Sequence, residues 1–304
     1  MHPAISTHLF LQQRLTPALL DTLHGAGARG IEVFAARHHF DYADRAAVRE
    51  IANWFRSNNV TASLHMPLFS ADEEQQWSRH TPATLNLIDS NKSERIATMD
   101  EVKRALEAAE QVPFRACVIH LGQKDDKWST RTLDDSLTAI EHLKAFAGPL
   151  GVKLLLENLS NSVATPAHLV EIVHVGHFSG VGFCLDTGHA HIAAPSDEWL
   201  TKHASRMRDE AGENTPPDGL AEAFEVFGDN LNELHLHDNG GMRDEHCWPG
   251  DSPHGGLDWK IVRNGIAALK EAPAGVLEIA HDPAPDMKGV AAKAAAAWRL
   301  LGIA

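Results

Sequence analysis

Short apolar segments alternate with longer amphipathic segments along the whole chain. Several of the short segments are continuous apolar runs, which are typical of parallel strands covered on both faces. The pattern predicts eight strands with helices between them. The predicted strands are Ile5–Phe10, Ile31–Ala35, Thr61–Pro67, Phe114–Gly122, Lys153–Asn158, a segment within Val181–Ala190, Leu231–Asn239 and Gly275–Ala280.

Helical spacing and capping residues predict a helix after each strand. Thr16-Pro17 and Thr165-Pro166 are typical helix starts, with threonine as the N-cap and proline in the first turn. Apolar residues recur at helical spacing within Ser93–Gln111. The remaining helices are predicted near Asp44–Asn58, Leu133–Phe146, Pro217–Phe227, Asp258–Glu271 and Asp286–Leu301. Eight strand–helix units favour a single (β/α)8 TIM barrel over a doubly wound sheet, with residues 1–304 forming one domain.

Three long loops, at about 68–92, 192–216 and 239–257, each follow a predicted strand. In a barrel these loops lie at the C-terminal face of the strands, where active sites are found. We therefore expect the functional residues at the ends of the strands and in these loops.

Composition limits the class of protein. The chain has 304 residues, with 41 acidic and 27 basic side chains and a net charge of −14. This balance argues against general binding to nucleic acid or to membrane surfaces, which are themselves anionic, although a local basic groove stays open. Three cysteines without a CxxC pattern, together with the lack of an evident signal peptide or membrane span, predict a cytoplasmic protein.

Polar side chains stand at the ends of the apolar strands. A carboxylate within LLLEN or VLEI is costly in an apolar core without a partner, and a divalent cation is the simplest partner that several such groups can share. Taken one at a time, a lone histidine is more often structural, Asp186 could cap a helix, and Asp244-x-His246 could be an ordinary polar loop. The strand-end residues are His65, His120, Glu157, Asp186, His189, His235, His237 and Glu278. Other histidines are expected on the surface: His2, His24, His80, His142, His168, His174, His177 and His203.

The segments LLLEN, GFCLDTGHAH, LHLHDN with the downstream RDEH, and GVLEI resemble the xylose isomerase-like TIM-barrel superfamily. That superfamily contains isomerases and epimerases of sugars and sugar phosphates, and also the endonuclease IV-like AP endonucleases (family 2). The resemblance implies a four-ligand site for a divalent metal. Its ligands would be Glu157, Asp186, His235 and Glu278, with His237 close by.

The AP endonucleases add five ligands and hold three zinc ions. The resemblance supplies a candidate for each additional ligand: His65, His120, His189, Asp244 and His246. The family's Gly-x-Gly loop is only loosely matched by GDSPHGGLDW, which has extra residues before Gly255-Gly256.

Two functions are open, and the sugar isomerase or epimerase is favoured. There Glu157 and Glu278 would be the catalytic pair, moving a proton next to a carbonyl through an enediolate while the metal polarises the substrate. The partner would be a small carbohydrate, and the metal would be Mn²⁺ or Zn²⁺, with Mg²⁺ or Co²⁺ also open. Candidate substrate contacts are Glu32 on the second strand, His189, His237, and the loop residues Trp128 and Trp248, which could instead pack the loops down.

The alternative is a zinc-dependent AP endonuclease, and a lyase or hydrolase acting on oxidised sugars could use the same metal site. The loop from Asp238 to Asp258 argues against the endonuclease. It holds Arg243 as its one Lys or Arg against five acidic residues, whereas gripping a duplex needs several phosphate contacts from cations. The substrate, its phosphorylation and the oligomeric state stay open.

Overall fold

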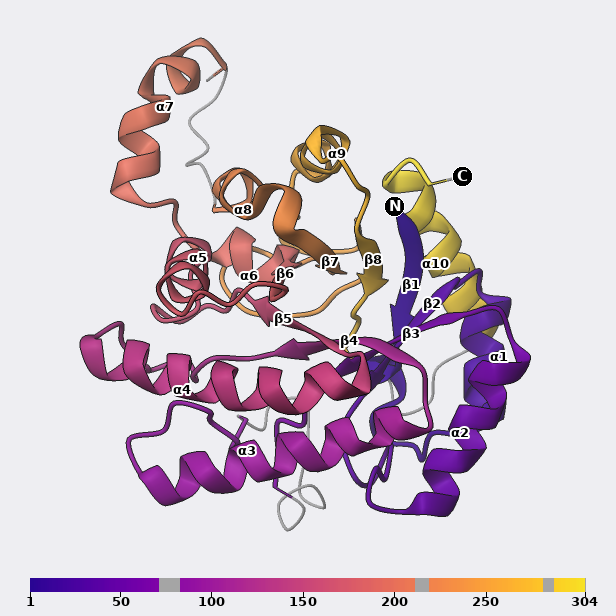
Figure 1. Cartoon of the computed structure of the whole chain (residues 1–304). Helices are drawn as coiled ribbons and strands as arrows, with labels where there is room; N and C mark the ends of the chain where they lie inside the picture. The colour runs from indigo at the N-terminus through magenta and orange to yellow at the C-terminus, as the bar shows by residue number, and fades with distance from the viewer. Residues whose placement is uncertain (71–82, 211–218, 281–286, 304) are drawn as a thin grey trace.

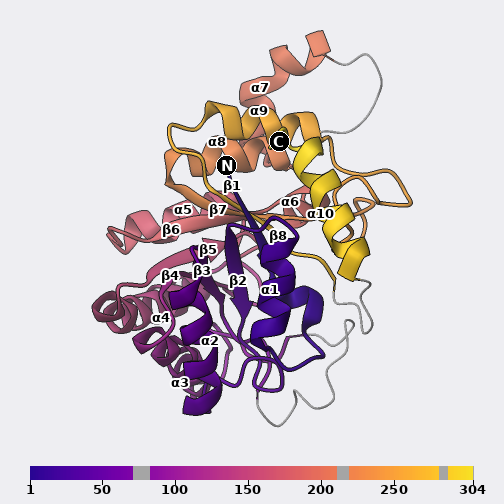
Figure 2. The same cartoon turned by 90° about the vertical axis from the view of Figure 1, so that its right-hand side faces the viewer.

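Eight parallel strands close into a barrel in the order of the sequence, and the last strand pairs with the first (Figures 1 and 2). The computed structural model describes residues 1–70, 83–210, 219–280 and 287–303. The predicted (β/α)8 barrel is therefore confirmed. The strands are β1 (His2–Ser6), β2 (Gly30–Phe34), β3 (Thr61–His65), β4 (Phe114–Ile119), β5 (Lys153–Glu157), β6 (Gly182–Asp186), β7 (Leu231–Leu236) and β8 (Ala274–Leu277).

Helices cover the outside of the barrel (Figure 1), and apolar side chains from strands and helices pack into one large core between them. Side-chain caps set several helix starts as the sequence predicts: Thr16 and Thr165 each accept a hydrogen bond from a backbone amide of the first turn. The helices are α1 (Pro17–Gly25), α2 (Arg45–Ser57), α3 (Lys92–Leu106), α4 (Thr130–Ala147), α5 (Pro166–Val175), α6 (Thr187–Ile192), α7 (Asp197–Glu210), α8 (Leu220–Phe227), α9 (Trp259–Ala268) and α10 (Met287–Leu300).

Two elements differ from the prediction. The first strand ends at Ser6, because the Ser6 hydroxyl accepts a hydrogen bond from the amide of His8 and starts a short 3-10 helix over Thr7–Phe10. The segment 192–216, predicted as a loop, contains α7, which extends away from the barrel in Figure 1. The sequence does indicate this helix, because Ser196 is followed by two acidic residues, which is typical of a helix start.

His203 was expected on the surface, and this is wrong. It lies on α7, is 8% exposed, stacks on Trp199 and places Nε2 3.0 Å from a carboxylate oxygen of Glu225. His80, and the most acidic part of the 68–92 loop, lie outside the described residues. Among the described residues, no helix is both long and apolar enough to cross a membrane.

Candidate metal centre

Nine of the predicted site residues converge at the C-terminal ends of the strands. They form three adjoining groups, in each of which one potential ligand atom per residue lies within 4.8 Å of the others. The central group takes one residue from each of β5, β6 and β7 and one from directly after β8. The groups are Glu157 with Asp186, His235 and Glu278; His65 with His120 and Glu157; and His189 with Asp244 and His246.

The central group is buried and rich in carboxylates. His235 Nδ1 lies 3.0 Å from Glu278 Oε2 and 3.4 Å from Glu157 Oε1. Despite these short distances, His235 Nδ1 makes no hydrogen bond of acceptable geometry and is fully buried. A buried nitrogen without a hydrogen-bond partner, facing buried carboxylates, is what a divalent cation would satisfy. The donor set of three carboxylates and one imidazole therefore fits a divalent metal.

Two imidazoles lie on one side of the central group, where Glu157 is shared. His120 Nε2 is 2.9 Å from Glu157 Oε2, and His65 Nε2 is 3.7 Å from the same oxygen. The two Nε2 atoms are 3.1 Å apart. This group would offer His65, His120 and Glu157 as ligands for a second ion.

The third group is centred on a carboxylate of the loop that follows β7. Asp244 Oδ2 lies 3.1 Å from His189 Nε2 and 3.2 Å from His246 Nε2. His189 comes from α6 and His246 from the same loop as Asp244, so this group links two separate segments above the barrel. It offers a third position for an ion.

Backbone carbonyl oxygens orient the rings of three of the five histidines in these groups. His65 donates Nδ1–H to Met66 O at 2.8 Å, His189 donates Nδ1–H to Asn158 O at 2.9 Å, and His246 donates Nδ1–H to Glu278 O at 2.9 Å. A carbonyl oxygen can only accept, so each Nδ1 carries a proton, and Nε2 is the nitrogen left to bind an ion. This is the arrangement that metal-binding histidines adopt.

The charged side chains of these groups shift one another's pKa values strongly. Burial alone would raise the pKa of Glu157, but His120 and His235 outweigh it and hold that pKa well below its usual range. Burial likewise opposes charge on His246, yet Asp244 and Glu278 raise the pKa of His246 to about 10. Opposite charges so closely paired inside a cleft are typical of functional sites.

His237 supports Asp186 from behind. Its Nε2–H lies 2.9 Å from both carboxylate oxygens of Asp186, and its ring stacks on His246 with centroids 3.8 Å apart. Gly188 leaves the room for this ring, because a Cβ there would lie 2.0 Å from His237 Cε1. His237 is therefore placed to orient two predicted ligands at once.

Asp238 anchors the loop that carries Asp244 and His246. Its carboxylate accepts hydrogen bonds from the amides of Gly250 and Leu257, both at 2.9 Å, and from Trp259 Nε1 at 3.1 Å. Asp238 is 1% exposed. The sequence offered the LHLHDN motif but no signal for this structural role.

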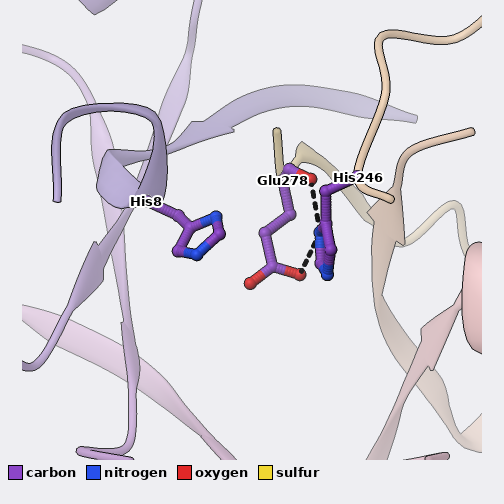
Figure 3. Close-up of side chains that lie close together, drawn as sticks. All are labelled: His8, His246 and Glu278. Atoms are coloured by element: carbon purple, nitrogen blue, oxygen red, sulfur yellow. Dashed lines mark hydrogen bonds and ion pairs between the residues drawn. The ribbon is translucent and has the colours of Figure 1, made fainter. Parts of the chain in front are cut away.

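His8 was missed by the sequence analysis, because the first strand was predicted to run on to Phe10. Its Nδ1–H donates to Ile279 O at 2.9 Å, and burial lowers its pKa to about 4. His8, His246 and Glu278 offer potential ligand atoms within 4.8 Å of one another, and Figure 3 shows the Glu278 carboxylate between the two rings. His8 therefore lines the β1–β8 side of the centre.

A cavity of about 820 Å³ opens onto the other side of the centre. Its wall includes His120, His189 and Asp244, together with amide and hydroxyl side chains from the loops after β3, β4 and β5. The tryptophans expected to cover a substrate lie elsewhere among the described residues: Trp128 stacks on His168 at 3.9 Å, and Trp248 packs against the core. Their position favours the structural interpretation that the sequence left open.

Glu32 is also placed differently from the expectation. It is fully buried within the barrel, with Oε2 3.0 Å from His235 Nε2, the ring nitrogen opposite the one that faces Glu157 and Glu278. A carboxylate enclosed beneath a histidine does not meet a substrate entering from the cavity.

The chain belongs to the xylose isomerase-like TIM barrel family, whose model matches residues 20–300. It is 27% identical over 180 residues to an uncharacterised protein of Methanocaldococcus jannaschii, which covers 57% of this chain and 54% of that protein. It is 26% identical over 196 residues to a probable endonuclease 4 of Natronomonas pharaonis, with coverage of 59% and 62%. The chain thus spans just over half to three fifths of the length of these curated relatives.

Solved structures match the whole barrel. A D-tagatose 3-epimerase-like protein superimposes with a TM-score of 0.70 at 20% identity, covering 99% of this chain and 97% of that one. The IolI protein with a bound zinc atom gives a TM-score of 0.70 at 14% identity, with coverage of 99% and 98%. At these identities the likeness shows the fold. The predicted family is confirmed.

Proposed function

We propose that the protein is a divalent-metal-dependent enzyme that isomerises or epimerises a sugar or related polyol by moving a proton next to a carbonyl. The observation that carries the proposal is the pair of buried carboxylates, Glu157 and Glu278, which both lie close to the same nitrogen of His235. Two carboxylates beside one substrate carbon suit such a reaction, because one can remove the proton and the other can return it on the opposite face.

The expected ligands of the central ion are Glu157, Asp186, His235 and Glu278. A divalent cation held there would polarise a carbonyl oxygen and stabilise the negative charge that develops when the neighbouring proton leaves. Mn²⁺ or Zn²⁺ suits a centre that mixes carboxylates and imidazoles, and Mg²⁺ or Co²⁺ stays an alternative.

The chain's own groups supply the remaining steps. Glu157 and Glu278, as carboxylates, can accept the proton from carbon and give it back on the same or the opposite face. His189, which lines the cavity, can hydrogen-bond a substrate hydroxyl. Amide and hydroxyl groups on the cavity wall, including Asn86, Gln123 and Ser160, suit a polyhydroxylated substrate.

A phosphodiester hydrolase of the endonuclease IV type is the second candidate, and a specific observation favours it. The two outer groups, His65 with His120 and Glu157, and His189 with Asp244 and His246, adjoin the central one and would allow three ions together. Three ions can activate water and stabilise both the attacking and the leaving oxygen of a phosphodiester. The acidic loop that carries Asp244 still argues against a duplex substrate.

The deciding experiment measures two reactions with protein loaded with Mn²⁺ or with Zn²⁺. Ketoses and keto-sugars are incubated in D₂O, and NMR follows deuterium entering the carbon next to the carbonyl; an abasic DNA duplex is assayed in parallel for strand cleavage. We expect metal-dependent deuterium exchange that is lost in Glu157→Gln and Glu278→Gln while both variants stay folded. Cleavage of the duplex without exchange into any sugar would overturn the proposal in favour of the second candidate.

A further inference from the structure

The ring of His235, the histidine of the central group, is held by a carboxylate and not by a backbone carbonyl. Nδ1 points toward Glu157 and Glu278, while Nε2 lies 3.0 Å from Glu32 Oε2. Both His235 and Glu32 are 0% exposed, so no water competes for this contact from the surface. Since an ionised carboxylate can only accept, Nε2 carries the proton and Nδ1 keeps its lone pair toward the central group.

The surroundings of Glu32 do little to stabilise it. Its second oxygen, Oε1, is buried without a hydrogen-bond partner. A second carboxyl group, that of Glu233, lies in the same interior, 4% exposed, with Oε1 hydrogen-bonded to the Ser63 hydroxyl at 3.0 Å. Two carboxyl groups enclosed together destabilise the fold. This cost suggests that at least one of them is retained for a role other than stability.

We propose that Glu32 is a positioning residue of the metal centre, which fixes the tautomer and the ring orientation of His235 so that Nδ1 serves as a ligand. Glu32, His235 and the ion would form the carboxylate–histidine–metal chain that sets ligand basicity in many metalloproteins. This role takes the place of the substrate contact expected from the sequence. The inference rests on the metal centre of the proposed function and is independent of the sugar chemistry.

Opposite effects on stability and on metal affinity follow from this role. Without Glu32, the His235 ring is free to turn and to move its proton to Nδ1, which lies 3.0 Å from Glu278 Oε2 but makes no hydrogen bond to it in the present orientation. A turned ring that donates to Glu278 keeps the interior of the metal-free protein satisfied. Removing one of two enclosed carboxyl groups also relieves an unfavourable burial. Metal binding, in contrast, loses the fixed Nδ1 lone pair. A residue that only supported the fold would lower stability and affinity together.

The matched variants are Glu32→Gln and Glu233→Gln. Each replaces a buried carboxyl group by an amide of the same size, but only Glu32 bonds His235, since Glu233 Oε1 stays 3.9 Å from Nε2. Glu32→Leu removes the acceptor altogether. Metal affinity is measured by competition for Zn²⁺ with a fluorescent chelator, and stability by chemical denaturation of the metal-free protein.

We expect Glu32→Leu to weaken Zn²⁺ binding by about 10- to 100-fold, the range found when such outer partners of metal ligands are removed. Glu32→Gln, which keeps an acceptor without the charge, should lie between Glu32→Leu and the wild type, and Glu233→Gln should stay close to the wild type. Metal-free Glu32→Gln should be no less stable than the wild type.

Three results would overturn the inference: affinity of Glu32→Gln equal to that of Glu233→Gln, Glu32→Leu binding Zn²⁺ like the wild type, or a fall in affinity matched by a fall in metal-free stability. If Glu32→Leu does not fold, the comparison of the two Gln variants decides alone. Wild-type protein that binds no divalent ion would refute the metal centre and this inference with it. Protein that binds the metal but exchanges no sugar proton would refute only the proposed function.

Discussion

Gly188→Ala tests whether the packing behind Asp186 controls metal binding. A Cβ at this position of α6 would lie 2.0 Å from His237 Cε1, far inside the 3.4 Å at which ordinary van der Waals contact begins. The His237 ring cannot simply step aside, because it bonds both oxygens of Asp186 at 2.9 Å and stacks on His246 at 3.8 Å. Any shift of the ring therefore disturbs two predicted ligands.

The expected magnitudes follow from this overlap. Overpacking of a rigid interior costs about 1–3 kcal/mol, which the higher helix propensity of alanine offsets by about 1 kcal/mol. Stability should fall modestly. Metal affinity should fall by about 10- to 100-fold, since His237 sets the orientation of Asp186.

The assay pairs chelator competition for Zn²⁺ with denaturation of the metal-free protein. Gly25→Ala is the matched control, because Gly25 is the last residue of helix α1 and a Cβ there meets nothing within 4 Å. It should bind Zn²⁺ like the wild type and be more stable by about 0.4–1 kcal/mol. Gly188→Ala protein with wild-type affinity for Zn²⁺ would refute the coupling of His237 to the centre.

Three further predictions concern the loop anchor and two buried groups away from the centre. Asp238→Ala removes the acceptor of the Gly250 and Leu257 amides and of Trp259 Nε1, and it should weaken Zn²⁺ binding in the same competition. An unchanged binding isotherm would show that the loop holds Asp244 in place without this anchor. Burial opposes ionisation of Glu101, but Tyr42 and Arg37 lower its pKa, so its stabilisation is present at neutral pH and is lost as the pH falls through that lowered pKa. Glu101→Gln should lower the free energy of unfolding at pH 7 by about 1–3 kcal/mol and by less in acid, and denaturation giving the same difference at both pH values would contradict this. Burial lowers the pKa of His39 to about 4, so the free energy of unfolding of the wild type should fall by up to about 3 kcal/mol between pH 6.5 and pH 4. The free energy of unfolding of His39→Leu should fall by less over the same range. An equal fall in both proteins would contradict this prediction.

The sequence was sufficient for the barrel and for the set of residues at its mouth. Parallel strands bring their C-terminal ends to one face, so polar residues that end successive apolar strands must meet. His120 and Glu278 are far apart in the chain, yet both contribute to one cluster of adjoining groups for this reason. Predicting this cluster requires only that the C-terminal end of each strand is located in the sequence.

The depth of a side chain within the barrel could not be predicted in the same way. Glu32 and His235 both lie on strands and both point inward, but pattern alone does not tell which lies above the other. The structure places Glu32 behind His235, so the residue expected to meet substrate instead touches the far nitrogen of a predicted ligand. Strand alternation gives the face of a residue, and only the register of neighbouring strands gives its layer.

Single local contacts explain the other differences between the predicted and the observed positions of residues. One hydrogen bond from the His8 amide to Ser6 ends the first strand early and turns His8 toward Glu278. Stacking of Trp128 on His168 keeps that aromatic out of the cavity wall. Such contacts join residues whose pairing the sequence does not encode as a pattern.

The most direct test of the metal centre is to locate bound ions by anomalous X-ray diffraction at the absorption edge of Mn²⁺ or Zn²⁺ in crystals of the metal-loaded protein. We expect an ion within about 2.0–2.3 Å of His235 Nδ1 and of a carboxylate oxygen of Glu278, with further ions, if present, at the two outer groups. A protein that takes up the metal but shows no anomalous peak between Glu157, Asp186, His235 and Glu278 would contradict it.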